Sequence, residues 1–226
     1  MRFGRQGLAA PVLGAVLLTA VGCASGGSTR SERNDAQRYL RLGQMQLDQG
    51  KTSQAIESMR KAIDQDPRMV EAYNFLGLIY LTNSEFDRAI EQFEEAVKID
   101  PYFTDARNNL GIACRRVGQL DRAEEEFQAA LKDGNYRSPE KIHLNLGHLY
   151  LEQNRHGEAI ESFQRAVEIA PEYLLGLMGL GQAYIAAGQV DQAETALNKV
   201  IRIAPDSPEA ERARQMITGQ AKRDDR

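Results

Sequence analysis

The chain has 226 residues, of which 42% are hydrophobic and 27% are charged, a composition typical of a folded protein rather than a disordered one. Its length suits one ordinary domain or a short repeat array. The net charge is −4, and lysine and arginine are scattered along the chain. This argues against a nucleic-acid-binding protein, which needs a basic stripe.

Residues 1–22 have the pattern of a bacterial export signal. Two arginines precede an apolar run, Leu8–Val21, that is too short for a transmembrane helix of about 20 residues. Small residues then lead to Cys23, an arrangement that resembles a bacterial lipobox, with Ala20 where leucine is usual. The resemblance implies a cleaved lipoprotein signal peptide and covalent lipid on Cys23. A plain secretory signal with an incidental cysteine is the alternative.

Residues 23–35 are mostly small and polar, which predicts a flexible tether between the lipid and a folded domain. One acyl chain binds a bilayer marginally and stable anchoring takes two or more; lipoprotein processing, as the resemblance implies, adds three. Ala24 follows the cysteine, where the best-known sorting rule places aspartate in lipoproteins kept at the inner membrane. We therefore expect a lipid-anchored protein at the outer membrane, facing the periplasm.

The rest of the chain repeats itself with a period near 34 residues. Leu-Gly pairs recur at intervals of 34, 34, 36 and 34, and an alanine follows each glycine after twelve residues. The pairs begin at Leu42, Leu76, Leu110, Leu146 and Leu180. The pattern resembles the tetratricopeptide repeat, a 34-residue helix-turn-helix unit. It implies an all-α fold, a right-handed α-solenoid over 36–218 with repeats at about 36–69, 70–103, 104–139, 140–173 and 174–207.

Each repeat position has a packing role. Gly77 and Ala89 leave space where the two helices of a repeat cross, and Phe93 fills the gap toward the next repeat. Pro101 lacks an amide hydrogen and ends the second helix. Gly50, Gly118 and Gly188 suit left-handed turns between helices, and Ser84 suits a helix N-cap.

The last face of a repeat stack needs a cover, and residues 208–218 predict an amphipathic capping helix. Residues 219–226 are expected to form a disordered tail. Repeat three carries two extra residues within 132–141. This insertion is either a tolerated surface loop, because loops lengthen at little cost, or an exposed contact made by Tyr136 and Arg137.

No catalytic or metal-ligating constellation is evident, so we expect a protein that is not an enzyme and that has no cofactor beyond the lipid. His148 and Glu152 lie four residues apart, which is explained better by a helix-surface hydrogen bond than by a metal. Cys114 takes the place of a tyrosine found in other repeats and is expected to be a buried, inert thiol. Nothing predicts a small-molecule substrate.

The first helices are expected to line a concave groove that binds a protein partner. Asn74, Asn109 and Asn145 recur near one level, where their amides either bond a bound peptide backbone or satisfy neighbouring helices. Leucines and isoleucines also occupy groove positions at which the repeat fold does not need an apolar side chain for packing. Such an apolar concave surface is typical of a partner site. The predicted groove residues are Leu40, Asn74, Leu78, Leu81, Asn108, Asn109, Ile112, Arg115, Arg116, Asn145 and His148.

The lipobox cysteine, the tether, the array and the segment "ARNNLGIACRRVGQLDRAEEEFQAAL" resemble the type IV pilus biogenesis and stability lipoproteins of the PilF/PilW and Tgl type. These are pilotins for the outer-membrane secretin. The resemblance implies an assembly chaperone that binds a secretin subunit, chiefly through Asn74, Leu78, Asn109 and Ile112. It would promote outer-membrane localisation and multimerisation of the secretin, and hence pilus assembly and motility. Members commonly have six repeats, whereas five are counted here.

Two other interpretations fit the same sequence. One is a periplasmic lipoprotein scaffold for β-barrel assembly or for a cell-wall synthase. The other is an uncleaved cytoplasmic-type co-chaperone whose apolar N-terminus forms a membrane stub.

Overall fold

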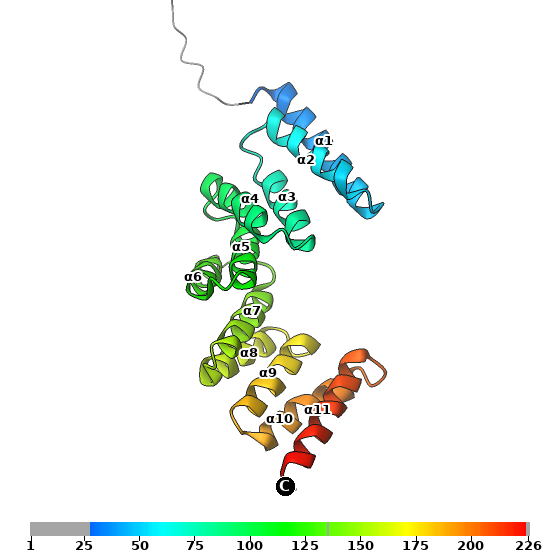
Figure 1. Cartoon of the computed structure of the whole chain (residues 1–226), viewed down its shortest axis with the longest axis vertical. Coiled ribbons are helices and arrows are strands. Elements are labelled where there is room, and N and C mark those ends of the chain that lie inside the picture. The colour runs from blue at the N-terminus through cyan, green and yellow to red at the C-terminus, as the bar shows by residue number, and fades with distance from the viewer. Residues whose placement is uncertain (1–27, 135, 225–226) are drawn as a thin grey trace, which may run out of the picture.

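The computed structural model describes residues 28–134 and 136–224, and the regular structure in these ranges is entirely helical. Eleven helices follow one another in these described ranges and form an elongated stack (Figure 1). Five helical pairs and a last helix make up the stack, with these bounds: α1 (Arg30–Asp48) and α2 (Thr52–Gln65), α3 (Val70–Thr82) and α4 (Phe86–Ile99), α5 (Thr104–Arg116) and α6 (Leu120–Ala130), α7 (Pro139–Glu152) and α8 (His156–Ile169), α9 (Leu174–Ala186) and α10 (Val190–Ile203), and α11 (Pro208–Asp224). The predicted α-solenoid is confirmed. The predicted signal peptide and Cys23 lie outside the described residues.

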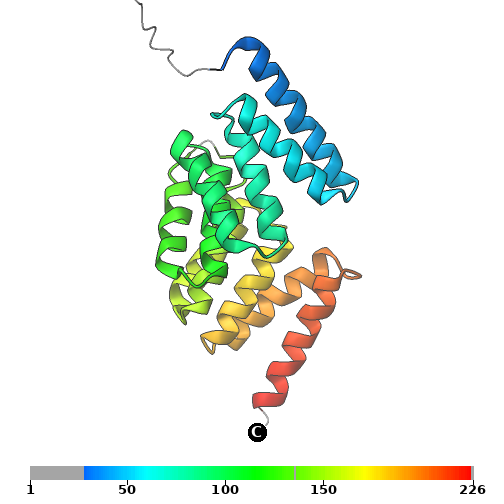
Figure 2. The same ribbon diagram turned by 45° about the horizontal axis from the view of Figure 1, so that its top comes forward.

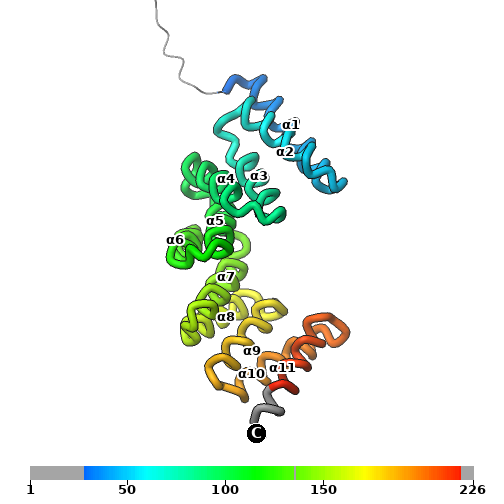
Figure 3. Tube along the Cα trace, in the orientation of Figure 1, coloured from blue at the N-terminus to red at the C-terminus, as the bar shows by residue number. Residues whose placement is uncertain are grey.

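The stack has an inner side formed by the first helix of each pair. From α3 onward each first helix packs against the first helix of the next pair, whereas second helices pack on the following first helix. The first helices therefore lie closer together, and the stack bends toward them. Figure 2 shows this arc, with α1–α2 and α10–α11 at its two ends, and the tube in Figure 3 follows the same path.

Glycine in each first helix makes room for a large side chain of its own repeat. A Cβ added to Gly77 would stand 2.5 Å from a ring carbon of Phe93, and Gly111 and Gly147 face Phe127 and Phe163 in the same way. All three rings are fully buried. The glycine is needed for close packing, as predicted, but it contacts Phe93 itself. Phe93 also belongs to the same buried cluster as Leu110 of the next repeat.

The turns inside the repeats require a left-handed residue. Gly50, Gly118 and Gly188 have φ of 71°, 79° and 73°, which confirms the predicted turn role. The other two repeats use Ser84 and Asn154, with φ of 62° and 58°. Ser84 is therefore a left-handed turn residue and not the predicted N-cap, because α4 begins after Glu85. Its position in the repeat is that of the glycines.

Both ends of the array are longer than the sequence pattern indicated. The predicted tether 23–35 overlaps α1, which begins at Arg30 because Thr29 and Glu32 form a reciprocal capping box. At the other end α11 extends beyond 218 to Asp224, into the segment expected to be a disordered tail. Gly219 lies inside this helix, where glycine costs about 1 kcal/mol relative to alanine.

Candidate functional site

The eleven predicted groove residues all lie on first helices: α1, α3, α5 and α7. The fold therefore brings them to the inner half of the stack. Their exposure differs, however, and so do their partners. They form three groups: the asparagines, the aliphatic side chains, and the arginines of α5 with His148 of α7.

The asparagines bond to one another across successive repeats. Asn109 donates from Nδ2 to Oδ1 of Asn74 at 2.9 Å, and Asn145 donates from Nδ2 to Oδ1 of Asn108 at 2.8 Å. The acceptor residues, Asn74 and Asn108, are buried at 7% and 9% exposure. Of the two roles open from the sequence, satisfying neighbouring helices is the one that these contacts fill. The donor residues, Asn109 and Asn145, are half-buried.

The aliphatic side chains are packed and still partly exposed. Leu40, Leu78, Leu81 and Ile112 contact the main buried cluster of the array. They therefore do contribute to packing, contrary to the expectation that the repeat fold does not need them. Because each retains some exposed surface, the inner side presents a broken line of apolar side chains over α1, α3 and α5.

Arg115 of α5 joins the next repeat through an ion pair. Its Nη1 donates to Oε1 of Glu152 at 2.6 Å, and its side chain is only 17% exposed. The sequence suggested a hydrogen bond between His148 and Glu152, but Glu152 pairs with Arg115 instead. The His148 ring packs edge-on against Phe163, with centroids 5.1 Å apart. Burial, with Arg115 nearby, lowers the pKa of His148, so its neutral form is favoured. Arg116 is exposed.

The extra loop of repeat three folds back on α5. Tyr136 donates its hydroxyl to Oδ1 of Asp105 at 2.8 Å, and Thr104 donates to Oδ2 of Asp133 at 2.7 Å. Burial and this bond raise the pKa of Tyr136. Tyr136 is half-buried and Arg137 is exposed. The loop is therefore a packed part of the array rather than a projecting contact at Tyr136.

On the outer side, charged side chains bridge the second helices of successive repeats. Arg88 lies over the Tyr80 ring, 3.9 Å from its centroid, and both Arg88 and Arg60 donate to the tyrosine hydroxyl. Together they line a cavity of about 380 Å³ between α2 and α4. Sequence reasoning missed these bridges, although a tyrosine three residues after the glycine in three of the five Leu-Gly pairs was a signal for them.

The next two grooves are bridged in related ways. Between α4 and α6, Arg122 bonds Glu94 beside Cys114, which is fully buried as predicted. Burial raises the pKa of this thiol, which disfavours the reactive thiolate. Between α6 and α8, Arg155 donates to Glu124 at 2.6 Å and lies over a tyrosine ring.

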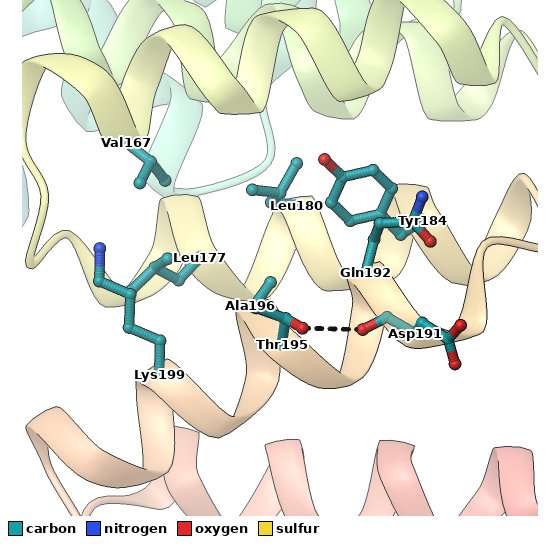
Figure 4. Close-up of a pocket in the computed structure, with 9 residues that line it drawn as sticks. All are labelled: Val167, Leu177, Leu180, Tyr184, Asp191, Gln192, Thr195, Ala196 and Lys199. Carbon is teal, nitrogen blue, oxygen red and sulfur yellow. Dashed lines mark hydrogen bonds between the residues drawn. The ribbon is translucent and has the colours of Figure 1, made fainter.

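The groove between α8 and α10 has a different character. It holds a cavity of about 360 Å³ whose walls include Val167, Leu177, Leu180 and Ala196. Figure 4 shows the aliphatic side chains between Lys199 at one end and Asp191 at the other, with the Tyr184 ring beside Gln192. No predicted site residue lies in this groove.

Within the residues that the structure describes, no cluster of histidine, cysteine and carboxylate side chains has the geometry of a metal site. The described helices also include none that is long and apolar enough to cross a bilayer.

Three models of the tetratricopeptide repeat family match this chain, over residues 40–102, 103–172 and 141–217. Together they span residues 40–217, nearly the whole helical stack. The chain belongs to the tetratricopeptide repeat family. This fold is a scaffold for protein–protein interaction, and its repeats present extended concave surfaces to protein partners. No curated protein matches the chain.

Several solved structures share this fold. PilF from Pseudomonas aeruginosa is 20% identical, with a TM-score of 0.71, over 86% of this chain and 93% of that one. PilW, described as a widely conserved type IV pilus biogenesis factor, is 21% identical, with a TM-score of 0.69, over 81% and 92%. A MamA protein is 24% identical, with a TM-score of 0.66, over 76% and 93%. At these identities the likeness concerns the fold.

Proposed function

We propose that this tetratricopeptide repeat protein is a pilotin: a lipoprotein of the outer membrane that binds a secretin subunit of the type IV pilus on its inner side. The lipid on Cys23 would hold the array at the membrane, facing the periplasm. Binding would bring secretin subunits there and promote their multimerisation, and hence pilus assembly and pilus-dependent motility.

The observation that carries the proposal is the inner side itself. Leu78 and Ile112 pack against the buried cluster and remain partly exposed, so each can contact a partner while it stays packed in the fold. Such a row suits an amphipathic helix or an extended segment of a partner. The likeness to PilF and PilW in fold, together with the lipobox pattern at Cys23, favours a partner in pilus assembly.

The partner is tested by photocrosslinking in cells. A photoreactive residue replaces Leu78 or Ile112, and the matched control places it at Glu125, which is exposed on the outer helix α6. We expect a secretin adduct from the two inner positions and none from the control. A different envelope protein captured at the inner positions would favour the alternative role, a scaffold for β-barrel assembly or cell-wall synthesis.

The anchor and the escort role need separate tests. Labelled palmitate should be incorporated into the wild-type protein and not into Cys23→Ser. Deletion of the gene should remove secretin multimers from the outer membrane, and a copy encoding Cys23→Ser should restore few of them. Undiminished multimers in the deletion strain would contradict the pilotin role.

A further inference from the structure

The outer groove between α8 and α10 lacks the arginines found in the corresponding groove between α2 and α4. Gln192 occupies the repeat position of Arg88, and Gln164 occupies that of Arg60. Gln164 donates its amide to the Tyr184 hydroxyl at 2.9 Å, but among the described residues no guanidinium lies over the ring, unlike at Tyr80 and Tyr150. Four of the nine side chains that line this cavity are aliphatic and two are charged, whereas in the cavity between α2 and α4 two are aliphatic and four are charged.

The two charges of this groove stand apart at its ends (Figure 4). In the described part of the chain Lys199 makes no ion pair, whereas Arg88, Arg122 and Arg155 in the other grooves all bond carboxylates. Asp191 lies in the first turn of α10, where a carboxylate is favourable to the helix, and is exposed. The groove thus offers an apolar centre, a cation at one end and an acceptor at the other.

We propose that this groove is a second docking site, for an extended segment of a partner protein in which a large apolar side chain is followed by a carboxylate. The apolar side chain would enter between Val167, Leu177 and Leu180. The carboxylate would pair with Lys199, and backbone N–H groups of the same segment would lie toward Asp191. About 360 Å³ is at the small end of ligand-pocket sizes and suits one large side chain with its neighbours.

The charge pattern favours a peptide over a lipid. An anionic headgroup would be attracted by Lys199 and repelled by Asp191 and Glu194 on the same helix. A polypeptide satisfies both ends, because it carries donors as well as a carboxylate. The site lies on the outer side, so it goes beyond the proposed secretin contact and leaves the inner side free for it.

The test uses the purified whole chain with labelled leucine and valine methyl groups, observed by NMR. The probes are short capped peptides with Phe-Glu, Phe-Lys or Ala-Glu at the centre. We expect Phe-Glu to shift the methyl signals of Val167, Leu177 and Leu180. Phe-Lys should bind about fivefold more weakly, since an exposed charge pair is worth up to about 1 kcal/mol, and Ala-Glu should not bind.

Two variants locate the site. Gln192→Arg introduces the arginine that Arg88 provides at the same repeat position. Its guanidinium should cover the Tyr184 ring and thereby abolish binding of every peptide. Lys199→Glu should reverse the preference, so that Phe-Lys binds better than Phe-Glu. Arg202→Glu is the control, because it makes the same charge change at an exposed position one turn further along α10. It should leave the preference unchanged.

The proposal is overturned if Phe-Glu causes no shift, if the shifts appear at inner-side Leu78 instead, or if Gln192→Arg binds as the wild type does. It is also overturned if sedimentation shows a dimer that Gln192→Arg dissociates, because a second copy would then occupy the groove. None of these outcomes depends on the secretin, so the pilotin role stands or fails separately.

Discussion

The Phe163 ring offers a sharp test of how closely successive first helices approach. A Cβ added to Gly179 of α9 would stand 2.3 Å from a ring carbon of Phe163, and one added to Gly147 of α7 would stand 2.6 Å from it. The ring is fully buried and is therefore held between two glycines of different repeats. Substitution of Gly179 by alanine places a methyl group where the Phe163 ring already fills the space.

The magnitude follows from two opposing effects. Overpacking of a closed core costs about 1–3 kcal/mol, and the upper part of that range applies because Gly147 blocks the ring from retreating. Replacing glycine with alanine inside a helix returns about 1 kcal/mol. We therefore expect Gly179→Ala to lower the free energy of unfolding by about 2 kcal/mol.

Urea denaturation followed by helical circular dichroism measures the loss. The matched control is Gly157→Ala in α8, where an added Cβ meets nothing within 4 Å; it should be neutral or stabilising. Because a repeat array can unfold in segments, hydrogen exchange should place the loss in α7–α9. Addition of Phe163→Leu, the residue found at Leu197 in the next repeat, should recover part of it. A Gly179→Ala chain as stable as the control would refute the packing argument.

Three further perturbations test the contacts between repeats. Asn145→Ala leaves the amide oxygen of buried Asn108 without its donor and should cost about 1–2 kcal/mol in urea denaturation. The hydrogen bond from Arg155 is the main cause that lowers the pKa of Glu124. The ionised carboxylate therefore stabilises the fold above the pKa that Glu124 has in the unfolded chain, and this stabilisation is lost as the pH falls through the pKa of the folded protein. Glu124→Gln should lower the melting temperature at neutral pH and have little effect in acid. Burial lowers the pKa of His148, so the unfolded chain binds more protons; stability should fall as pH drops below about 6.5, and His148→Gln should flatten that slope in urea titrations at several pH values.

Each of these three predictions has its own contrary result, and the first has a control variant. Asn198→Ala, at an exposed position of α10, should change the stability by less than about 0.5 kcal/mol; an equal effect at Asn145 would deny the bridge. A difference between Glu124→Gln and the wild type that is independent of pH would remove the ion pair as its cause. If His148→Gln showed the same loss of stability in acid as the wild type, other titrating groups would be its cause.

The architecture was predictable from the sequence because the repeat period encodes it. A Leu-Gly pair with an alanine twelve residues later fixes two helices and their crossing, and five copies in phase fix the stack. The start of α1 was also readable, since Thr29 and Glu32 have the capping-box spacing, but the small residues around them favoured a tether.

The side-chain partners were harder to predict. Asn74 and Asn109 occupy adjacent rather than equivalent repeat positions, so their bond depends on the offset between neighbouring first helices, which the period does not give. Ser84 has the positive φ that glycine has at this position in other repeats, and no sequence pattern indicates that a serine adopts this strained backbone conformation. The apolar outer groove is visible in the sequence only by comparing Gln192 with Arg88 once both are known to face a groove.

The asparagine pairs and the paired glycines show that one repeat motif gives different contacts between first helices along the stack. Asn109 and Asn145 stand two residues before the repeat glycine, and each bridges to the preceding first helix. In repeat five that position is Gly179, which has no side chain to bridge and packs directly on Phe163. The polar bridges therefore end at α7, and the Phe163 ring of α8 lies between α7 and α9 at the next junction. Since the outer groove between α8 and α10 opens over this same junction, the change on the inner side accompanies the change from charged to aliphatic on the outer side.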